Sequence, residues 1–274
     1  MTAGADWRGR VGRSWAEHWQ RTDRSFGTLT ERLLHYTRAL NFMNVLDVGC
    51  GAGEVSVALA RSHGHARIQG IDLSEDLIEV AQSRGERYAN LSFSAMDAAR
   101  WEDPTMTPDL LVSRHGVMIL PNPKRAFNHL LNLAAPGAEL AFACFRARSE
   151  NHWATELDRL VGNEPAPASI REPGPFAFGN REEVERMLLD AGWSEPQFEP
   201  FDYAMVAGSG ENPVEEARAY FLRIGPAAGA IAELSGADHS DAVSRLEQML
   251  RYHEVDGLVA MGAAAWIVTA RKPL

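Results

Sequence analysis

The sequence predicts an α/β protein built on a parallel β-sheet with helices on both of its faces. Short apolar segments alternate with amphipathic segments from residue 44 to residue 145, as they do where helices connect parallel strands. A glycine-rich segment, "VLDVGCGAGEVSVALA" (45–60), runs from the first apolar segment into the first amphipathic one. Open α/β sheets bind their ligands at such strand-to-helix turns.

The elements follow in order along the chain. We predict strands at five apolar segments: 44–48, 66–72, 91–97, 108–120 and 138–145. Three helices lie between them, at 54–63, 74–88 and 123–134. The second opens with Ser74, a favoured N-cap, followed by acidic residues in its first turn. A helix at 180–193, a strand near 197–207, a mostly helical segment at 212–252 and a last strand at 263–272 complete the domain.

Three segments depart from this alternation. Residues 1–40 carry scattered aromatic and charged residues, and we predict an N-terminal helical lid of two helices with a break near Ser25–Gly27. The main domain is expected to span 41–274, with cap insertions at about 147–179 and 211–258. The first insertion contains the proline-rich "EPAPASIREPGPFAFG", and its length suggests a functional segment over the site.

Composition narrows the class of partner. The chain has 274 residues, with 27 basic and 37 acidic residues and a net charge of −10, which disfavours a nucleic-acid partner. Its two cysteines, Cys50 and Cys144, form no C-x-x-C pair, so we expect no metal and a reducing compartment. No signal peptide is apparent, and the longest uncharged stretch is too short to span a bilayer. We therefore expect a soluble cytoplasmic protein, and a homodimer is one expectation for its assembly.

The spacing of the glycines does not match the fingerprint of a dinucleotide-binding site. Gly49, Gly51 and Gly53 form G-x-G-x-G, whereas a dinucleotide fingerprint is G-x-G-x-x-G. Asp47 precedes the glycines and would repel a pyrophosphate, while a cationic amino-acid group would tolerate it. Asp72 ends the second predicted strand, where its carboxylate can accept hydrogen bonds from ribose hydroxyls. These residues predict a nucleoside without phosphates.

At this point the sequence resembles a known family. "LDVGCGAG" followed by "GIDLS", the later "SAMDA" and "LAAPGAELAFACF" are similar to class I S-adenosylmethionine-dependent methyltransferases. "SRHGVMIL", "PGPFAFG" and "AAAWIVTARKP" resemble a bacterial subgroup related to the ubiquinone and menaquinone methyltransferases. The resemblance implies a Rossmann-like, seven-stranded, mostly parallel sheet with an antiparallel last strand and a helical cap.

The resemblance also implies contacts to S-adenosylmethionine. Asp72 is expected to hold the ribose, Leu73 to pack on the adenine, and Asp97 to meet the adenine amino group. The full set of expected cofactor contacts is Asp47, Gly49, Cys50, Gly51, Asp72, Leu73, Asp97, Ala98 and Arg114. Two other roles are open for Arg114. It could form a structural ion pair, which we favour, or bind an acidic substrate.

Methyl transfer by in-line displacement depends chiefly on alignment, which can contribute about 7–11 kcal/mol. His115, where the fourth predicted strand leaves the sheet, is the candidate catalytic residue, either as a general base or as a ring stacked near the methionine chain. The candidates for the acceptor pocket, each of which could instead be core packing, are Trp19, His152, Trp153, Phe176 and Phe178. Phe176 and Phe178 would face one side of an extended segment.

We therefore predict transfer of a methyl group to a small, partly apolar organic acceptor, with S-adenosylhomocysteine as product. The alternative is a protein of the same fold that binds S-adenosylmethionine without methyl transfer, in a lyase-like or regulatory role. The shifted third glycine disfavours a nicotinamide dehydrogenase.

Overall fold

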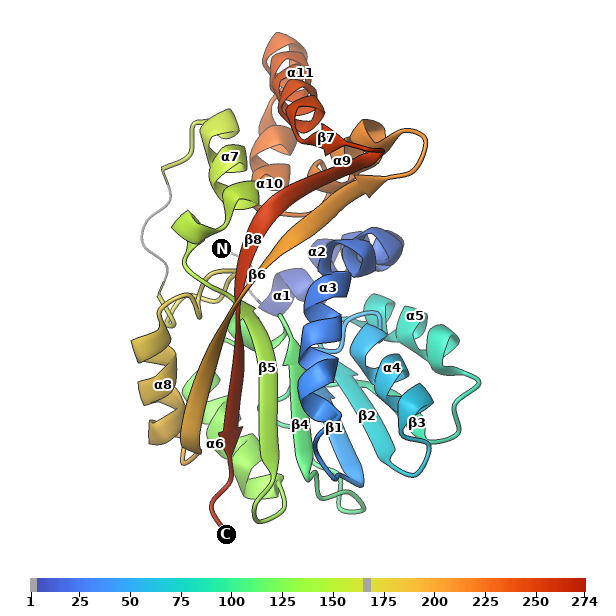
Figure 1. Ribbon diagram of the computed structural model, residues 1–274, viewed down its shortest axis with the longest axis vertical. Coiled ribbons are helices and arrows are strands. Elements are labelled where there is room, and N and C mark those ends of the chain that lie inside the picture. The colour runs from blue at the N-terminus through green and yellow to red at the C-terminus, as the bar shows by residue number, and fades with distance from the viewer. Residues whose placement is uncertain (1–3, 165–168) are drawn as a thin grey trace.

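The computed structural model describes residues 4–164 and 169–274. Its centre is one sheet with strand order β3-β2-β1-β4-β5-β8-β6, and the short β7 pairs with β8 (Figure 1). Strand β8 is antiparallel to both β5 and β6, and the pairs among β1 to β5 are parallel. The strands are β1 (Asn44–Val48), β2 (Arg67–Asp72), β3 (Leu91–Ala95), β4 (Leu110–Arg114), β5 (Glu139–Phe145), β6 (Ser194–Ser209), β7 (Glu254–Val255) and β8 (Leu258–Arg271). The predicted mostly parallel sheet with an antiparallel last strand is confirmed.

Helices cover both faces of the sheet (Figure 1). The helices α3, α4 and α5 lie on one face, and α6 and α8, which pack against each other, lie on the other. The helices are α1 (Gly4–Trp7), α2 (Arg10–Glu17), α3 (Trp19–Thr37), α4 (Glu54–Ser62), α5 (Glu75–Gly85), α6 (Pro123–Leu133), α7 (His152–Val161), α8 (Arg181–Asp190), α9 (Pro213–Phe221), α10 (Pro226–Glu233) and α11 (Gly236–Tyr252). Short 3₁₀ turns lie at Val117–Ile119 and Arg148–Glu150. Among the described residues, no helix has the length and apolar character needed to cross a membrane.

Local sequence explains where the main helices start. Ser74 caps α5 as predicted, because its Oγ accepts a hydrogen bond from the Leu77 N–H at 3.3 Å. Asn122 caps α6 in the same way, and Pro123 fills the first turn, where a missing N–H costs nothing. The central strands β1, β4 and β5 are buried on both faces, which is why they are almost continuously apolar.

The predicted break near Ser25–Gly27 is wrong. Helix α3 runs through these residues, since the Ser25 hydroxyl bonds back to the Arg21 carbonyl at 2.9 Å and also reaches the Val206 carbonyl in β6. The chain breaks instead at His18, between α2 and α3. Trp15 and Trp19 therefore lie on two helices, although both pack against the same small cluster.

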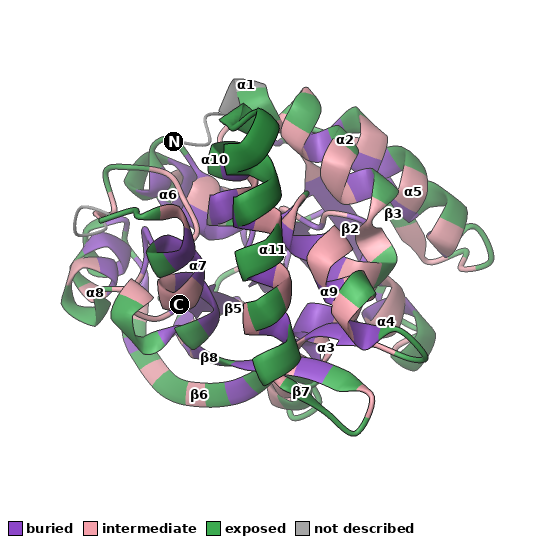
Figure 2. Cartoon of the chain, turned by 90° about the horizontal axis from the view of Figure 1, so that it is seen from above, coloured by how far each residue is buried: buried purple, intermediate pink, exposed green. Residues whose placement is uncertain are grey.

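A long antiparallel ribbon carries the cap. Strand β8 pairs with β6 along its length, but it pairs with β5 only from Arg271 to Ala265. This outer half of the β6–β8 ribbon extends past the sheet and bears α9, α10 and α11 (Figure 1). Seen from above, the cap helices α10 and α11 are largely exposed, while β5 beneath them is buried (Figure 2). The mostly helical segment predicted for 212–252 is confirmed.

Two segments of the first insertion and its neighbourhood differ from the predictions. The fourth strand ends at Arg114 rather than at residue 120, because His115 adopts a left-handed conformation. Residues 175–178 form a turn rather than an extended segment. Part of the proline-rich stretch, 165–168, lies outside the described residues.

Candidate active site

A cavity of about 520 Å³ lies at the carboxyl ends of the central strands, beneath the N-terminal helices and the cap. This volume is within the range of small-molecule sites. One end is lined by the glycine loop with Asp47 and Asp72, and the other by Met118, Phe145 and Trp153. The cavity thus joins a polar end formed at the ends of β1 and β2 to an apolar end under the cap.

Four N–H groups of the glycine loop are engaged in hydrogen bonds within the protein. The N–H groups of Gly49 and Cys50 both donate to the Ile71 carbonyl, at 2.8 and 3.0 Å. The Gly51 N–H donates to Asp72 Oδ2 at 2.9 Å, and the Gly53 N–H donates to the Cys50 carbonyl at 2.9 Å. A phosphate site needs several free N–H groups aimed at one point. These four groups, three of them on the glycines of the motif, are therefore not available to a phosphate.

Glycine is required at position 49 for a steric reason. Its φ is +68°, and a Cβ there would lie 2.6 Å from the Cα of Gly116. The turn after β1 thus presses against the turn after β4, at the edge of the cavity. This contact holds the glycine loop and the residue after His115 in one rigid unit.

The Asp72 carboxylate fixes the second turn. Its Oδ1 accepts from the Ser74 N–H at 2.9 Å, and its Oδ2 accepts from the Gly51 N–H. Burial raises the pKa of Asp72, and these backbone donors oppose that rise. Each carboxylate oxygen can accept a further hydrogen bond. Asp72 lines the cavity, so a ligand hydroxyl there finds a fixed acceptor.

Asp47 is buried with half of its carboxylate unused. Its Oδ2 accepts from the Ser56 hydroxyl at 2.6 Å, whereas its Oδ1 finds no partner among the described residues. Burial raises the pKa of Asp47 to about 6, despite the Ser56 hydrogen bond and the nearby Arg114. Buried polar atoms are rarely left unpaired. A cationic ligand group in this end of the cavity would supply the missing partner.

Cys50 and Cys144 are free, buried thiols. Burial raises the pKa of Cys50 far above its ordinary value, and the charges of Asp47 and Asp72 add to this effect. The neutral thiol is a poor nucleophile. Cys50 therefore contributes packing and backbone to the site rather than chemistry.

His115 stands between the two ends of the cavity. Its backbone φ is +61°, and its N–H donates to the Ala143 carbonyl at 2.9 Å. The imidazole stacks on Phe145 with ring centroids 4.1 Å apart, and it meets the edge of Phe26 at 4.9 Å. Neither ring nitrogen has a partner among the described residues. Burial lowers the pKa of His115 well below its ordinary value, and Arg114 lowers it further, so the ring is neutral.

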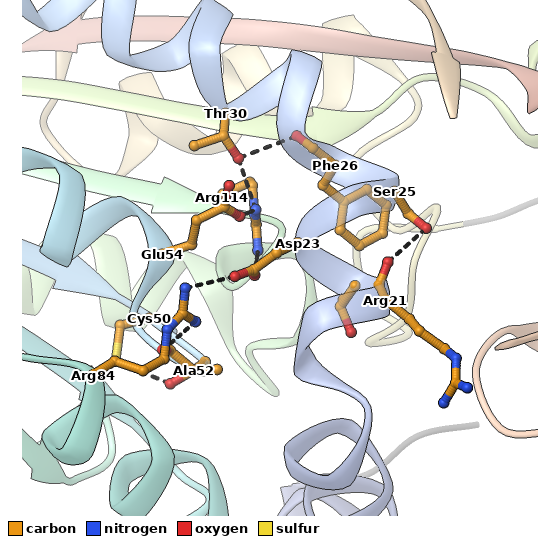
Figure 3. A network of polar contacts seen from close by, with 12 residues as sticks. Arg21, Asp23, Ser25, Phe26, Thr30, Cys50, Ala52, Glu54, Arg84 and Arg114 are labelled. Atoms are coloured by element: carbon orange, nitrogen blue, oxygen red, sulfur yellow. Dashed lines mark hydrogen bonds and ion pairs between the residues drawn. The ribbon is translucent and has the colours of Figure 1, made fainter. Parts of the chain in front are cut away.

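Arg114 belongs to an ion-pair network, as favoured from the sequence (Figure 3). It contacts the Glu54 carboxylate and donates to the Thr30 hydroxyl at 2.7 Å. Its other terminal nitrogen lies 3.7 Å from Asp23 Oδ1, and Asp23 Oδ2 accepts from Arg84 at 2.6 Å. Asp23 in α3 therefore links the N-terminal helices to Arg114 at the end of β4 and to Arg84 in α5. Arg114 has no free charge for a substrate.

Two of the predicted acceptor-pocket residues line the cavity. Trp153 lies in its apolar end, beside Phe145 at 5.3 Å between ring centroids. Trp19 lies at the other end, where the Arg84 guanidinium stands 3.9 Å over its ring and Ala52 packs near it. Trp19 therefore covers the glycine loop rather than the space around Trp153.

Six predicted residues are absent from the lining of the cavity: Leu73, Asp97, Ala98, His152, Phe176 and Phe178. Asp97 closes its own turn by accepting from the Ala99 N–H at 2.9 Å. His152 is exposed and lies in a separate groove along β8. The two phenylalanines belong to the same hydrophobic core but have different ring neighbours, Phe145 for Phe176 and Phe142 for Phe178.

Sequence reasoning missed several side chains that line the cavity: Arg10, Phe26, Met118, Phe145, Tyr220 and Arg223. Phe145 had a usable signal, since it ends a predicted strand at the ligand-binding edge of the sheet. Phe26 and Arg223 had none, because they come from distant segments that only the tertiary fold brings together.

The fold and the turn after β1 are similar to those of Rossmann-like methyltransferase domains. Residues 45–137 match the family model described as a methyltransferase domain. The chain is 35% identical over 122 residues to a ubiquinone biosynthesis O-methyltransferase of Coxiella burnetii, which covers 44% of this chain and 50% of that protein. It is 28% identical over 157 residues to a malonyl-[acyl-carrier protein] O-methyltransferase of Paenibacillus, covering 55% of each.

The chain therefore spans about half the length of the curated relatives it matches. Among solved structures, an N-methyltransferase of Haemonchus contortus in complex with phosphomonomethylethanolamine and S-adenosylhomocysteine aligns with a TM-score of 0.56. It is 18% identical and covers 95% of this chain and 57% of that one. This likeness concerns the fold.

Proposed function

We propose that the protein is an S-adenosylmethionine-dependent methyltransferase acting on a small, partly apolar acceptor. One observation carries the proposal. A glycine turn whose Gly49, Gly51 and Gly53 N–H groups are engaged within the protein opens, together with Asp47 and Asp72, into the same cavity as an aromatic pocket. Such a cavity suits a nucleoside with a cationic amino-acid part at one end and an apolar acceptor at the other.

Each end has a defined task in this proposal. Asp72 accepts hydrogen bonds from the ribose, and the unpaired Oδ1 of Asp47 faces the amino group, directly or through a water. The bound S-adenosylmethionine supplies an already activated methyl group, so the protein mainly aligns the acceptor and excludes water. Phe145, Trp153 and Met118 serve this second purpose, because they are buried and apolar.

His115 is the proposed partner of the methyl-accepting group. A neutral imidazole offers one lone pair and one N–H, and both ring nitrogens of His115 lack partners in the described structure. It can accept the proton of an acceptor hydroxyl as the methyl group arrives. Because two relatives are named O-methyltransferases, oxygen acceptors are the first to test.

Leu73, Asp97 and Ala98 remain our proposed adenine contacts. They follow the ends of β2 and β3, next to Asp72. In the structure α2 packs closely there, since a Cβ on Gly12 would lie 2.3 Å from Ser74 Oγ. We propose that α1 to α3 act as a lid and that α2 shifts when the adenine binds. The reducing cytoplasm is our proposed location, consistent with two free cysteines.

Calorimetric titration with S-adenosylmethionine, S-adenosylhomocysteine and NAD tests the proposal. We expect micromolar binding of the first two and none of NAD. A panel of phenols and carboxylic acids then follows, with release of S-adenosylhomocysteine as the readout. Binding of NAD without S-adenosylmethionine would overturn the assignment. Tight cofactor binding without turnover on the whole panel would favour the non-transferring alternative.

A further inference from the structure

Two unpaired arginines stand at the opening of the cavity. Arg10 in α2 and Arg223 after α9 both line it, and both are exposed. Across residues 4–164 and 169–274, neither has a carboxylate within 4.0 Å. Both arginines therefore present an uncompensated positive charge to whatever occupies the opening of the cavity.

The two arginines belong to the same part of the rim. Arg10 and Ser14 are four residues apart on α2 and so share one side of that helix. The Ser14 hydroxyl donates to the backbone carbonyl of Arg223 at 3.3 Å. The contact places the end of α9 beside the face of α2 that carries Arg10. Both guanidinium groups can therefore reach one ligand group at the opening.

The other charges of the cavity do not compete for this role. Arg148 is held by two hydrogen bonds to Asp158, at 2.5 and 2.6 Å, and is neutralised there. Asp47 and Asp72 lie at the glycine-loop end. Asp6 also lines the cavity, and its negative charge opposes an anion rather than attracting one. The walls between the rim and His115 are apolar, formed by Met118, Ile119, Phe145, Trp153 and Ile224.

We infer that the acceptor is an amphipathic anion, whose carboxylate or phosphate is held at the rim by Arg10 and Arg223. Its apolar body then crosses the aromatic section, and its methyl-accepting atom reaches His115. Guanidinium groups bind carboxylate and phosphate through paired hydrogen bonds. This inference rests on the proposed methyltransferase function and names the substrate class of the same site.

The test uses matched acids and amides on protein saturated with S-adenosylhomocysteine. The probes are 4-hydroxybenzoate and 4-hydroxybenzamide, hexanoate and hexanamide, and phenyl phosphate and phenol, measured by calorimetry. We expect at least one anion to bind at least about tenfold more tightly than its neutral analogue, with an affinity that falls as salt rises. Arg10→Gln and Arg223→Gln should each weaken the binding of that anion by about threefold to tenfold and leave the affinity for the neutral analogue unchanged.

Arg13→Gln is the matched control, since Arg13 is an exposed arginine of the same helix that does not line the cavity. Asp6→Asn should strengthen the binding of the anion. The inference fails if no anion is preferred, if the arginine variants affect acid and amide equally, or if Arg13→Gln matches them. Absence of S-adenosylhomocysteine binding in the first titration would instead refute the proposed function itself.

Discussion

The two ends of the cavity are built in different ways. The glycine-loop end is made chiefly by one stretch, from Asp47 to Ser74, in which the Gly49, Gly51 and Gly53 N–H groups have acceptors, and Trp19 covers it. The cap end is made by residues far apart in the chain, from α2, α7, α9 and residues 173–175, together with Met118 and Phe145. The first end therefore has one geometry, while the second can change through substitutions far apart in the chain.

The unpaired atoms at the two ends differ accordingly. Within the described part of the chain, a carboxylate oxygen of Asp47 lacks a partner at the loop end, and the guanidinium groups of Arg10 and Arg223 lack a carboxylate at the cap end. His115, with two unpartnered nitrogens, lies where the ends meet. The cavity thus offers negative charge to one ligand and positive charge to the other, which separates donor and acceptor by electrostatics as well as by shape.

The largest expected effect is on turnover, from a substitution of His115, which lies where the two ends of the cavity meet. His115→Ala should reduce turnover about 10²-fold or more, the usual range for a lost acid–base group. Binding of S-adenosylhomocysteine should change by less than about threefold, because the ring faces the acceptor. Steady-state kinetics with the best acceptor, beside calorimetry, measure the two quantities.

The control for this variant is His65→Ala, an exposed histidine in the turn after α4. It should leave both quantities unchanged. Equal losses of turnover and cofactor affinity in His115→Ala would make His115 a binding residue and would remove the proposed proton transfer.

The loop end should show a pH-dependent cost of burying Asp47. Burial raises the pKa of Asp47 from 3.8 to about 6, so the folded state holds the Asp47 proton more tightly than the unfolded state does. The resulting contribution to the free energy of unfolding is fully present below about pH 4 and is lost as the pH rises to about 6. Asp47→Asn removes that loss. The variant should unfold with a free energy higher by up to about 3 kcal/mol at pH 8, and with little change at pH 4.

Urea unfolding of both proteins at the two pH values measures this difference. Asp190→Asn, which removes an exposed carboxylate paired with Lys124, is the control and should show no such pH dependence. The same Asp47→Asn variant should bind S-adenosylmethionine more weakly, as expected where a site sacrifices stability for binding. A gain in stability that is equal at both pH values would contradict this account.

The sequence predicted the turn at the loop end because its information is local, although the predicted contacts Leu73, Asp97 and Ala98 do not line the cavity. The spacing of Gly49, Gly51 and Asp72 follows from one strand–helix–strand unit. The mostly parallel sheet with an antiparallel last strand followed from the alternation and the family resemblance. Ser74 was identified as a cap for the same reason. The break at Ser25–Gly27 was wrong because Ser25 is satisfied inside α3 and against β6, a tertiary contact that local propensity cannot reveal.

The cap end was predicted only in part. Trp153 was identified because it stands near the start of the first insertion. Phe26 and Arg223 join the lining of the cavity only after α3 and α9 fold onto the sheet. Phe176 and Phe178 look equivalent in the sequence, yet a turn places them against different neighbours in the core, Phe145 and Phe142. Where side chains from distant segments build a pocket, residue type alone does not say which of them face it.

The smallest of the expected effects concerns Asp72. Asp72→Ala should weaken binding of S-adenosylhomocysteine by about 1–3 kcal/mol, because buried ribose hydroxyls lose their acceptor. The substitution also frees the N–H groups of Gly51 and Ser74, so the loop itself loosens. Asp103→Ala controls for that second effect, since Asp103 closes a similar turn with Thr105 away from the cavity. Calorimetry should show a loss for Asp72→Ala alone; equal affinities for both variants and the wild type would mean that the ribose is held elsewhere, and that Asp72 serves only to fix the loop.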